Sequence, residues 1–93
     1  VAECLWPAIF AAQIGEHDIA RAFCRRWMEL APDDPKPLGL LLDLELETRH
    51  YGDAVAWADR ILQASPENVA AREKRERAIA LAGELAMELE EKR

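Results

Sequence analysis

The sequence predicts an all-α fold, a solenoid of antiparallel helix pairs with about five helices, and three observations predict it. First, residues recur at a spacing of 34 along the chain, which is the period of a two-helix repeat. Second, the good helix formers Ala, Leu, Glu and Arg dominate its 93 residues. Third, aromatic residues make up only 6% of the chain and β-branched residues are also few, which disfavours a sheet.

The repeat is clearest in a stretch that begins at Gly15 and closes at a proline. The identical pairs at this spacing are Ala20 with Ala54, Ala22 with Ala56, Arg26 with Arg60, and Pro32 with Pro66. We therefore expect one domain, divided into a first repeat (1–34), a second repeat (35–68) and a capping helix (69–93). Because the chain begins with Val1 rather than Met, we expect it to be a piece of a longer protein or a processed product.

Two helices are expected in the first repeat. Apolar residues at helical spacing predict a helix that begins near Glu3–Trp6, keeps Pro7 in its first turn, where proline is tolerated, and ends at Gly15. An apolar stripe at i, i+4, i+8 spacing then predicts a helix from His17 or Asp18 to Leu30. Three prolines within the following stretch APDDPKP end it.

The second repeat follows the same plan. A leucine-rich segment from Asp34 or Pro35 to about Arg49 is apolar almost all round, which is typical of a helix between neighbours. A turn at residues 50–53 leads to a helix from about Asp53 to Ala64.

The last helix is expected to have a strong start signal. Ser65 would be its N-cap and Pro66 its first residue, and no proline interrupts the chain from there to Arg93. A single glycine costs a helix about 1 kcal/mol and does not by itself end it. We therefore expect one long helix, with a break at Gly83 as the alternative.

Two stretches resemble the second helix of the tetratricopeptide repeat, in which a small Ala, a large residue, another Ala and a closing Pro follow one another. They are Gly15…Ala20…Cys24…Trp27…Pro32 and Tyr51…Ala54…Ala58…Ile61…Pro66. The first helices lack the Trp-Leu-Gly-Tyr signature of that family, and Arg49 replaces its turn glycine. The resemblance implies a protein–protein interaction scaffold that binds a partner protein or peptide in a concave groove.

In this family the first helices of successive repeats line the groove, so the resemblance assigns nine residues to it. They are Trp6, Ile9, Gln13, Lys36, Leu40, Asp43, Glu47, Lys74 and Arg77. A structural interpretation is equally open, in which the acidic pair Asp43 and Glu47 forms ion pairs with Lys74 and Arg77 on the neighbouring helix. The two interpretations are compatible.

The last helix carries apolar residues at near-heptad spacing, which would form an exposed strip if no further helix covers them. The strip consists of Ala78, Ala82, Leu85 and Leu89. It favours an alternative function, a non-catalytic dimerisation or docking appendage of a larger enzyme, and it allows a homodimer.

Net charge, hydropathy and residue spacing restrict the class of partner and of function. The formal net charge of −6 disfavours nucleic acid and anionic membranes, which need a basic patch. No apolar run is long enough to span a membrane, so we expect no membrane insertion. His17 and His50 have no metal-ligand or catalytic spacing, so we expect no enzyme activity, no metal and no cofactor. The compartment is unknown, with the cytoplasm favoured.

Overall fold

Five helices make up the part of the chain that the computed structural model describes, which is residues 2–92, with side chains from residue 6 onward. They are α1 (Ala2–Gln13), α2 (His17–Leu30), α3 (Lys36–Glu47), α4 (Tyr51–Ala64) and α5 (Val69–Glu91). These residues include no strand. The all-α prediction and the number of helices are therefore confirmed.

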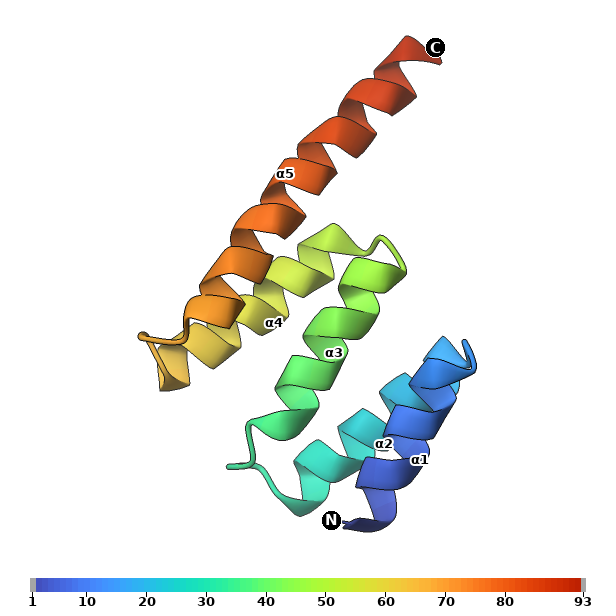
Figure 1. Ribbon diagram of the computed structural model, residues 1–93, viewed down its shortest axis with the longest axis vertical. Coiled ribbons are helices and arrows are strands. Elements are labelled where there is room, and N and C mark those ends of the chain that lie inside the picture. The colour runs from blue at the N-terminus through green and yellow to red at the C-terminus, as the bar shows by residue number, and fades with distance from the viewer. Residues whose placement is uncertain (1, 93) are drawn as a thin grey trace.

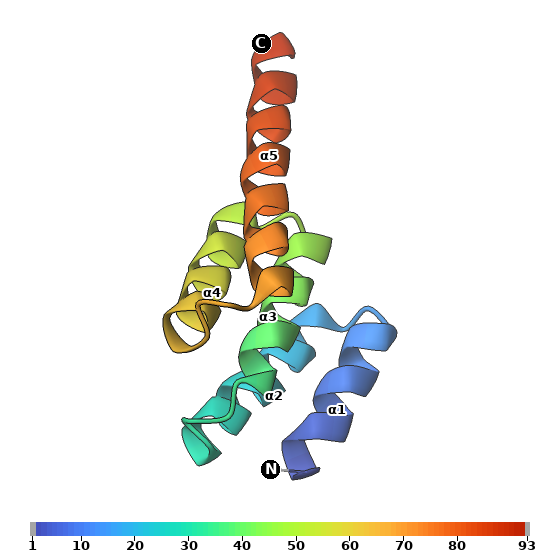
Figure 2. The same ribbon diagram turned by 60° about the vertical axis from the view of Figure 1, so that its left-hand side comes forward.

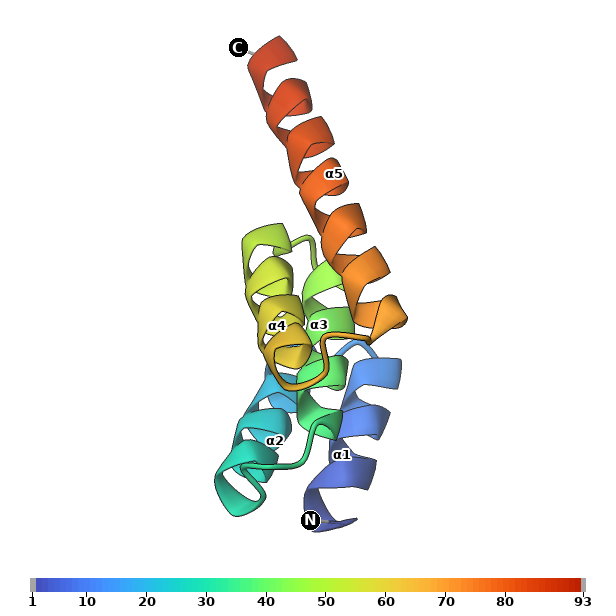
Figure 3. The same cartoon turned by 90° about the vertical axis from the view of Figure 1, so that its left-hand side faces the viewer.

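Helices that follow one another along the chain pack against each other, with short turns between them (Figure 1). Figure 3 shows α2 and α4 on one side of the molecule and α1 and α5 on the other, with α3 between them. The C-terminal half of α5 extends beyond the other helices. The molecule is accordingly elongated, with principal extents of 45 × 31 × 17 Å.

The core repeats at the spacing seen in the sequence. Ala20 and Ala54 are both fully buried, as are Cys24 and Ala58 one turn later, because small residues let neighbouring helices approach closely. Large side chains of α3 fill the space that these small residues leave. Leu44 packs among Ala11 and Ala20, whereas Leu42 packs among the alanines of α4 and α5.

The turns repeat as well. After α1, Gly15 takes a left-handed conformation (φ 83°), its N–H donates to Ala12, and the N–H of Glu16 donates to Ala11 over 2.8 Å. After α3, Arg49 does the same (φ 64°), with bonds from Arg49 to Leu46 and from His50 to Glu45. Both are Schellman motifs, which satisfy the last carbonyls of a helix. The fold is thus repeat-like in its backbone hydrogen bonds as well as in its core.

Several predicted helix boundaries are wrong. Pro7 is the sixth residue of α1 rather than part of its first turn, so the helix accepts one missing N–H in its interior. The third helix ends at Glu47, because Arg49 already has positive φ. The fourth begins at Tyr51 instead of Asp53.

The start of α5 is the clearest correction. Ser65 is the C-cap of α4, and its N–H donates to the carbonyl of Ile61. The helix begins three residues later than predicted, where the side chain of Asn68 accepts a 3.0 Å hydrogen bond from the N–H of Ala71. From Val69 to Glu91 the helix is continuous through Gly83. The expected single long helix is therefore confirmed, and the alternative, a break at Gly83, is wrong.

Candidate functional site

The nine predicted groove residues lie on the three odd-numbered helices, and none of them is buried. Trp6, Gln13, Lys36, Asp43, Glu47 and Arg77 are exposed, and Ile9, Leu40 and Lys74 are half-buried. Figure 3 shows α1 and α5 on one side of the molecule, with α3 next to them. We call these nine residues the odd-helix surface.

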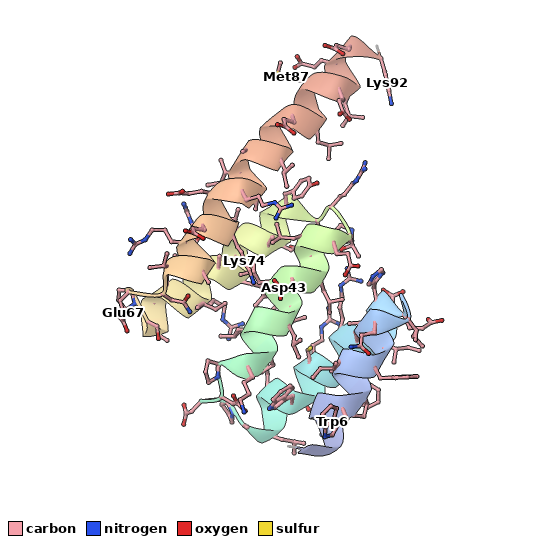
Figure 4. The ribbon with its side chains drawn as sticks, viewed as in Figure 1. Trp6, Asp43, Glu67, Lys74, Met87 and Lys92 are labelled. Carbon is pink, nitrogen blue, oxygen red and sulfur yellow. The ribbon has the colours of Figure 1, made fainter. Side chains whose placement is uncertain are left out.

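One ion pair joins α3 to α5 at the centre of this surface. Lys74 Nζ lies 2.7 Å from Asp43 Oδ1, and Figure 4 shows the two side chains meeting between their helices. Both side chains are 40% or more exposed, so water screens the pair and its contribution to stability is small. The structural interpretation of Asp43 and Lys74 as partners is therefore confirmed.

The second expected pair does not form. The cation nearest to Glu47 is the ring of His17, whose Nε2 lies 3.9 Å from Glu47 Oε2. Arg77 has no ion pair with any described residue and instead lines a shallow hollow on α5 together with Ala70, Glu73 and Lys74. The guanidinium of Arg77 therefore remains available to a partner.

The apolar members of the odd-helix surface are placed differently from one another. Trp6 leaves 69% of its surface exposed, at the N-terminal end of α1, and lies well apart from Asp43 and Lys74 (Figure 4). Leu40 instead packs against the buried Ala8, Cys24 and Leu41. The structure thus spreads the predicted residues over a long surface and does not gather them into one pocket.

The predicted strip on α5 needs one correction. Ala78 is fully buried in the core with Ala54 and Ala58, so it cannot belong to an exposed strip. Ala82 and Leu89 are exposed, and Leu85 is half-buried and lines a hollow together with Tyr51 at the start of α4. These three residues continue the helix face that Ala71 and Ala78 bury.

A polar cluster that sequence reasoning missed joins α2 to the end of α3. The guanidinium of Arg21 donates to Glu45 Oε1 from Nε over 3.0 Å and from Nη2 over 2.7 Å. Nη2 also lies 2.9 Å from the hydroxyl of Thr48 and 3.1 Å from Nδ1 of His50. The Glu45 carboxylate is buried, and its hydrogen bonds with Arg21 raise the pKa of the Arg21 guanidinium above its ordinary value, although burial opposes this.

The charged groups of this cluster pair with one another. Arg21 and Glu45 neutralise each other, and the Thr48 hydroxyl donates to the carbonyl of Leu44 over 2.8 Å. His50 belongs to the turn predicted at residues 50–53, and its ring contacts Thr48 and Glu45 of the cluster. A charged residue at position 45, where the 34-residue spacing places Ala11 in the first repeat, was the signal in the sequence that could have indicated it.

Among the residues that the structure describes, no group of three or more His, Cys, Asp and Glu side chains is arranged to hold a metal ion. None of their helices is long and apolar enough to cross a membrane.

Comparison with known proteins gives no relative from which a function could be transferred. No protein-family model matches the chain, and neither the curated proteins nor the solved structures include a significant match.

Proposed function

We propose that this chain is a protein-interaction scaffold, an α-solenoid of antiparallel helix pairs similar to the tetratricopeptide repeat. The turn geometry supports this, because the same hydrogen bonds recur after α1 and after α3, from Gly15 and Arg49. A second kind of bond recurs after α2 and α4, where the N–H of Ala31 donates to the carbonyl of Trp27 and the N–H of Ser65 donates to the carbonyl of Ile61, both over 2.8 Å. In this proposal residues 1–34 and 35–68 are the two repeats.

The helix α5 closes the array in this proposal. Ala8 of α1 and Leu42 of α3 are buried beneath the helix that follows each of them. The residue at the same position in α5 is Glu76, which is charged and exposed. A terminal helix with a polar outer face is what keeps a repeat array soluble. The residues 69–93 thus suit a capping helix.

The odd-helix surface is the proposed binding site, and one observation carries the proposal. Three successive odd-numbered helices present side chains of mixed character to solvent, and of the charged ones only Asp43 and Lys74 neutralise each other closely. Trp6 and Ile9 offer apolar contact near one end, and Arg77 offers an unpaired charge near the other. The fitting ligand is a segment of a partner protein with an apolar anchor and an acidic group some residues away.

Peptide selection from a random library, with the purified protein as bait, tests this. The affinity of selected peptides is measured by fluorescence anisotropy for the parent and for the double variant Asp43→Lys with Arg77→Glu. We expect at least a tenfold loss of affinity. The matched control is Arg26→Glu with Asp33→Lys, which also reverses two exposed charges and keeps the net charge. Arg26 lies on α2 and Asp33 in the turn after it, so this variant should bind the peptides as the parent does. Equal affinity of parent and Asp43→Lys/Arg77→Glu would contradict the proposal.

The strip gives a second candidate function, docking to a neighbouring domain of a larger enzyme. Its support is the extended half of α5, where Leu89 is 57% exposed and Leu85 is half-buried. An apolar helix face of this kind gains free energy by burial, at roughly 25 cal/mol per Å². Under this candidate, Leu85→Glu with Leu89→Glu abolishes docking and leaves peptide binding unchanged. Docking that survives the change removes the candidate.

A further inference from the structure

An uncovered apolar face lies on α1 and shares only Trp6 with the odd-helix surface. Trp6, Phe10 and Ile14 follow one another at a spacing of four residues, so they lie on one side of the helix. They are 69%, 63% and 59% exposed, which is unusual for three large apolar side chains in a row. In all three ribbon views α1 forms an outer edge of the molecule (Figures 1, 2 and 3). We call these three residues the α1 face.

The 34-residue repeat shows what the corresponding positions of α3 and α5 contact. The residues 34 positions after Phe10 and 68 positions after it are Leu44 and Ala78. Leu44 is buried against Ala11 and Ala20 of the preceding helices, and Ala78 is buried against Ala54 and Ala58. In the second and third odd-numbered helices this position therefore forms a helix–helix interface. Only in α1 does it meet solvent.

We infer that a second copy of this chain covers the α1 face, in a symmetric dimer with the two α1 helices antiparallel about a twofold axis at Phe10. This arrangement sets Phe10 against its counterpart and Trp6 of each copy against Ile14 of the other. A symmetric interface must be self-complementary, because the same patch serves both copies. A large ring opposite a smaller branched side chain satisfies that requirement.

Charge favours this face over the rest of the surface. Each copy has a net charge of −6, so most self-contacts bring like charges together. Between Trp6 and Ile14 the chain has no charged residue at all. On the strip of α5, by contrast, Glu84, Glu88 and Glu90 stand among the apolar residues. A head-to-tail contact is disfavoured as well, because the outer face of α5 presents Glu76.

The area sets the strength of the dimer. Two aromatic rings and an isoleucine at these exposures offer on the order of 400 Å² per copy. The interface would then bury roughly 800 Å² in total, below the ~1,200 Å² of stable complexes. The dimer is therefore weak and concentration-dependent. The dimer needs no ligand at the odd-helix surface and shares only Trp6 with it. Phe10→Glu on the one hand, and Asp43→Lys with Arg77→Glu on the other, therefore test the two proposals separately.

Sedimentation equilibrium over a range from micromolar to millimolar concentration tests the inference. The parent is expected to shift from monomer to dimer, and Phe10→Glu is expected to weaken self-association at least tenfold. Because Phe10 is mostly exposed, this variant should keep its helical circular dichroism. Ile79→Glu, which changes a comparably exposed apolar residue on α5, is the matched control and should leave the dimer unchanged.

Charge complementation adds a sharper test of the twofold axis. Phe10→Glu and Phe10→Lys should each be monomeric alone, and an equimolar mixture should form a heterodimer, since the axis brings the two positions together. A parent that stays monomeric to millimolar concentration overturns the inference. So does a dimer that survives Phe10→Glu or is abolished by Leu85→Glu with Leu89→Glu instead.

Discussion

At the scale of single residues, the Arg21–Glu45 pair is the strongest polar contact between the two halves of the chain. Their side chains are 14% and 8% exposed, so the Glu45 carboxylate depends on Arg21 for hydrogen bonds that water would otherwise supply, whereas Arg21 also donates to Asp18 over 3.1 Å. Position 45 corresponds to the buried Ala11 one repeat earlier. The second repeat thus holds a buried charge where the first holds a methyl group.

Replacing Arg21 with Met should lower the free energy of unfolding by about 2–4 kcal/mol, because the buried Glu45 carboxylate loses its partner. Urea denaturation followed by circular dichroism measures this. The double variant Arg21→Met with Glu45→Leu should recover most of the loss, since no charge is then buried. If Arg21→Met alone is as stable as the parent, the pair does not hold the two halves together.

Ala54 tests the close approach of helices at the same scale. It is completely buried, so Ala54→Leu should overpack the core and cost about 1–3 kcal/mol in urea denaturation. Ala56→Leu, at an exposed position of the same helix, should change stability by less than about 0.5 kcal/mol. Equal effects of the two substitutions would refute the close crossing at Ala54.

At the scale of elements, the turns differ in what they demand of their residues. Gly15 and Arg49 both have positive φ, which costs a residue with a side chain about 1–2 kcal/mol. Glycine avoids that strain but is more flexible when unfolded, which offsets about 0.5–1 kcal/mol. The turn after α3 therefore contains strain that the turn after α1 does not.

Arg49→Gly should accordingly raise the thermal midpoint, by a stability gain of about 0.5–1 kcal/mol. Gly15→Ala should lower the thermal midpoint. Backbone strain alone causes this, because no atom lies within 4 Å of the position of the added Cβ. Thermal scans of both variants decide the point. A less stable Arg49→Gly protein would mean that the arginine side chain stabilises the turn by more than its backbone strain costs.

The start of α5 provides another element-scale test. Asn68→Ala removes the bond from its side chain to the N–H of Ala71 and should cost about 0.5–2 kcal/mol. Ser65→Ala should cost much less, because no cap bond of Ser65 to α5 is seen. A reversed order of the two effects in urea denaturation would restore the predicted cap at Ser65.

The sequence predicts elements well here and their boundaries less well, for physical reasons. Periodic apolar residues give the five helices, because burial of one face decides helix formation. Ser65–Pro66 resembled a helix start, but Ser65 is the C-cap of α4, and the turn follows from there. Two residues that can cap a helix, Ser65 before a proline and Asn68, stand within four positions, and Asn68 is the one whose side chain caps α5.

Surface residues were harder to predict than helices. The resemblance assigned nine residues to the odd-helix surface, and none of them is buried, but near-heptad spacing also placed Ala78 on an exposed strip. Ala78 is buried against Ala54 and Ala58 of α4, whereas Ala82 one turn later is exposed, and periodicity cannot tell where a helix face stops being covered. Phe10 was missed for the converse reason, because an apolar residue in a regular pattern suggests burial.

At the scale of the whole molecule, the 34-residue repeat produces two kinds of surface. One runs across α1, α3 and α5 and has mixed charge, which suits a segment of a partner protein. The other is the α1 face, where the repeat has an interface position without a helix to cover it. Function in this proposal depends on side chains that the array displays, at positions set by the spacing of its helices.

Amide chemical-shift mapping of the protein with a selected peptide shows whether a partner binds across the odd-numbered helices. We expect the largest shifts on α3 and α5 around Asp43, Lys74 and Arg77, with smaller ones toward Trp6. The amides of the exposed side of α2 and α4 should stay unchanged. Shifts centred on α2 and α4, with none around Asp43 and Lys74, would contradict binding across the odd-numbered helices.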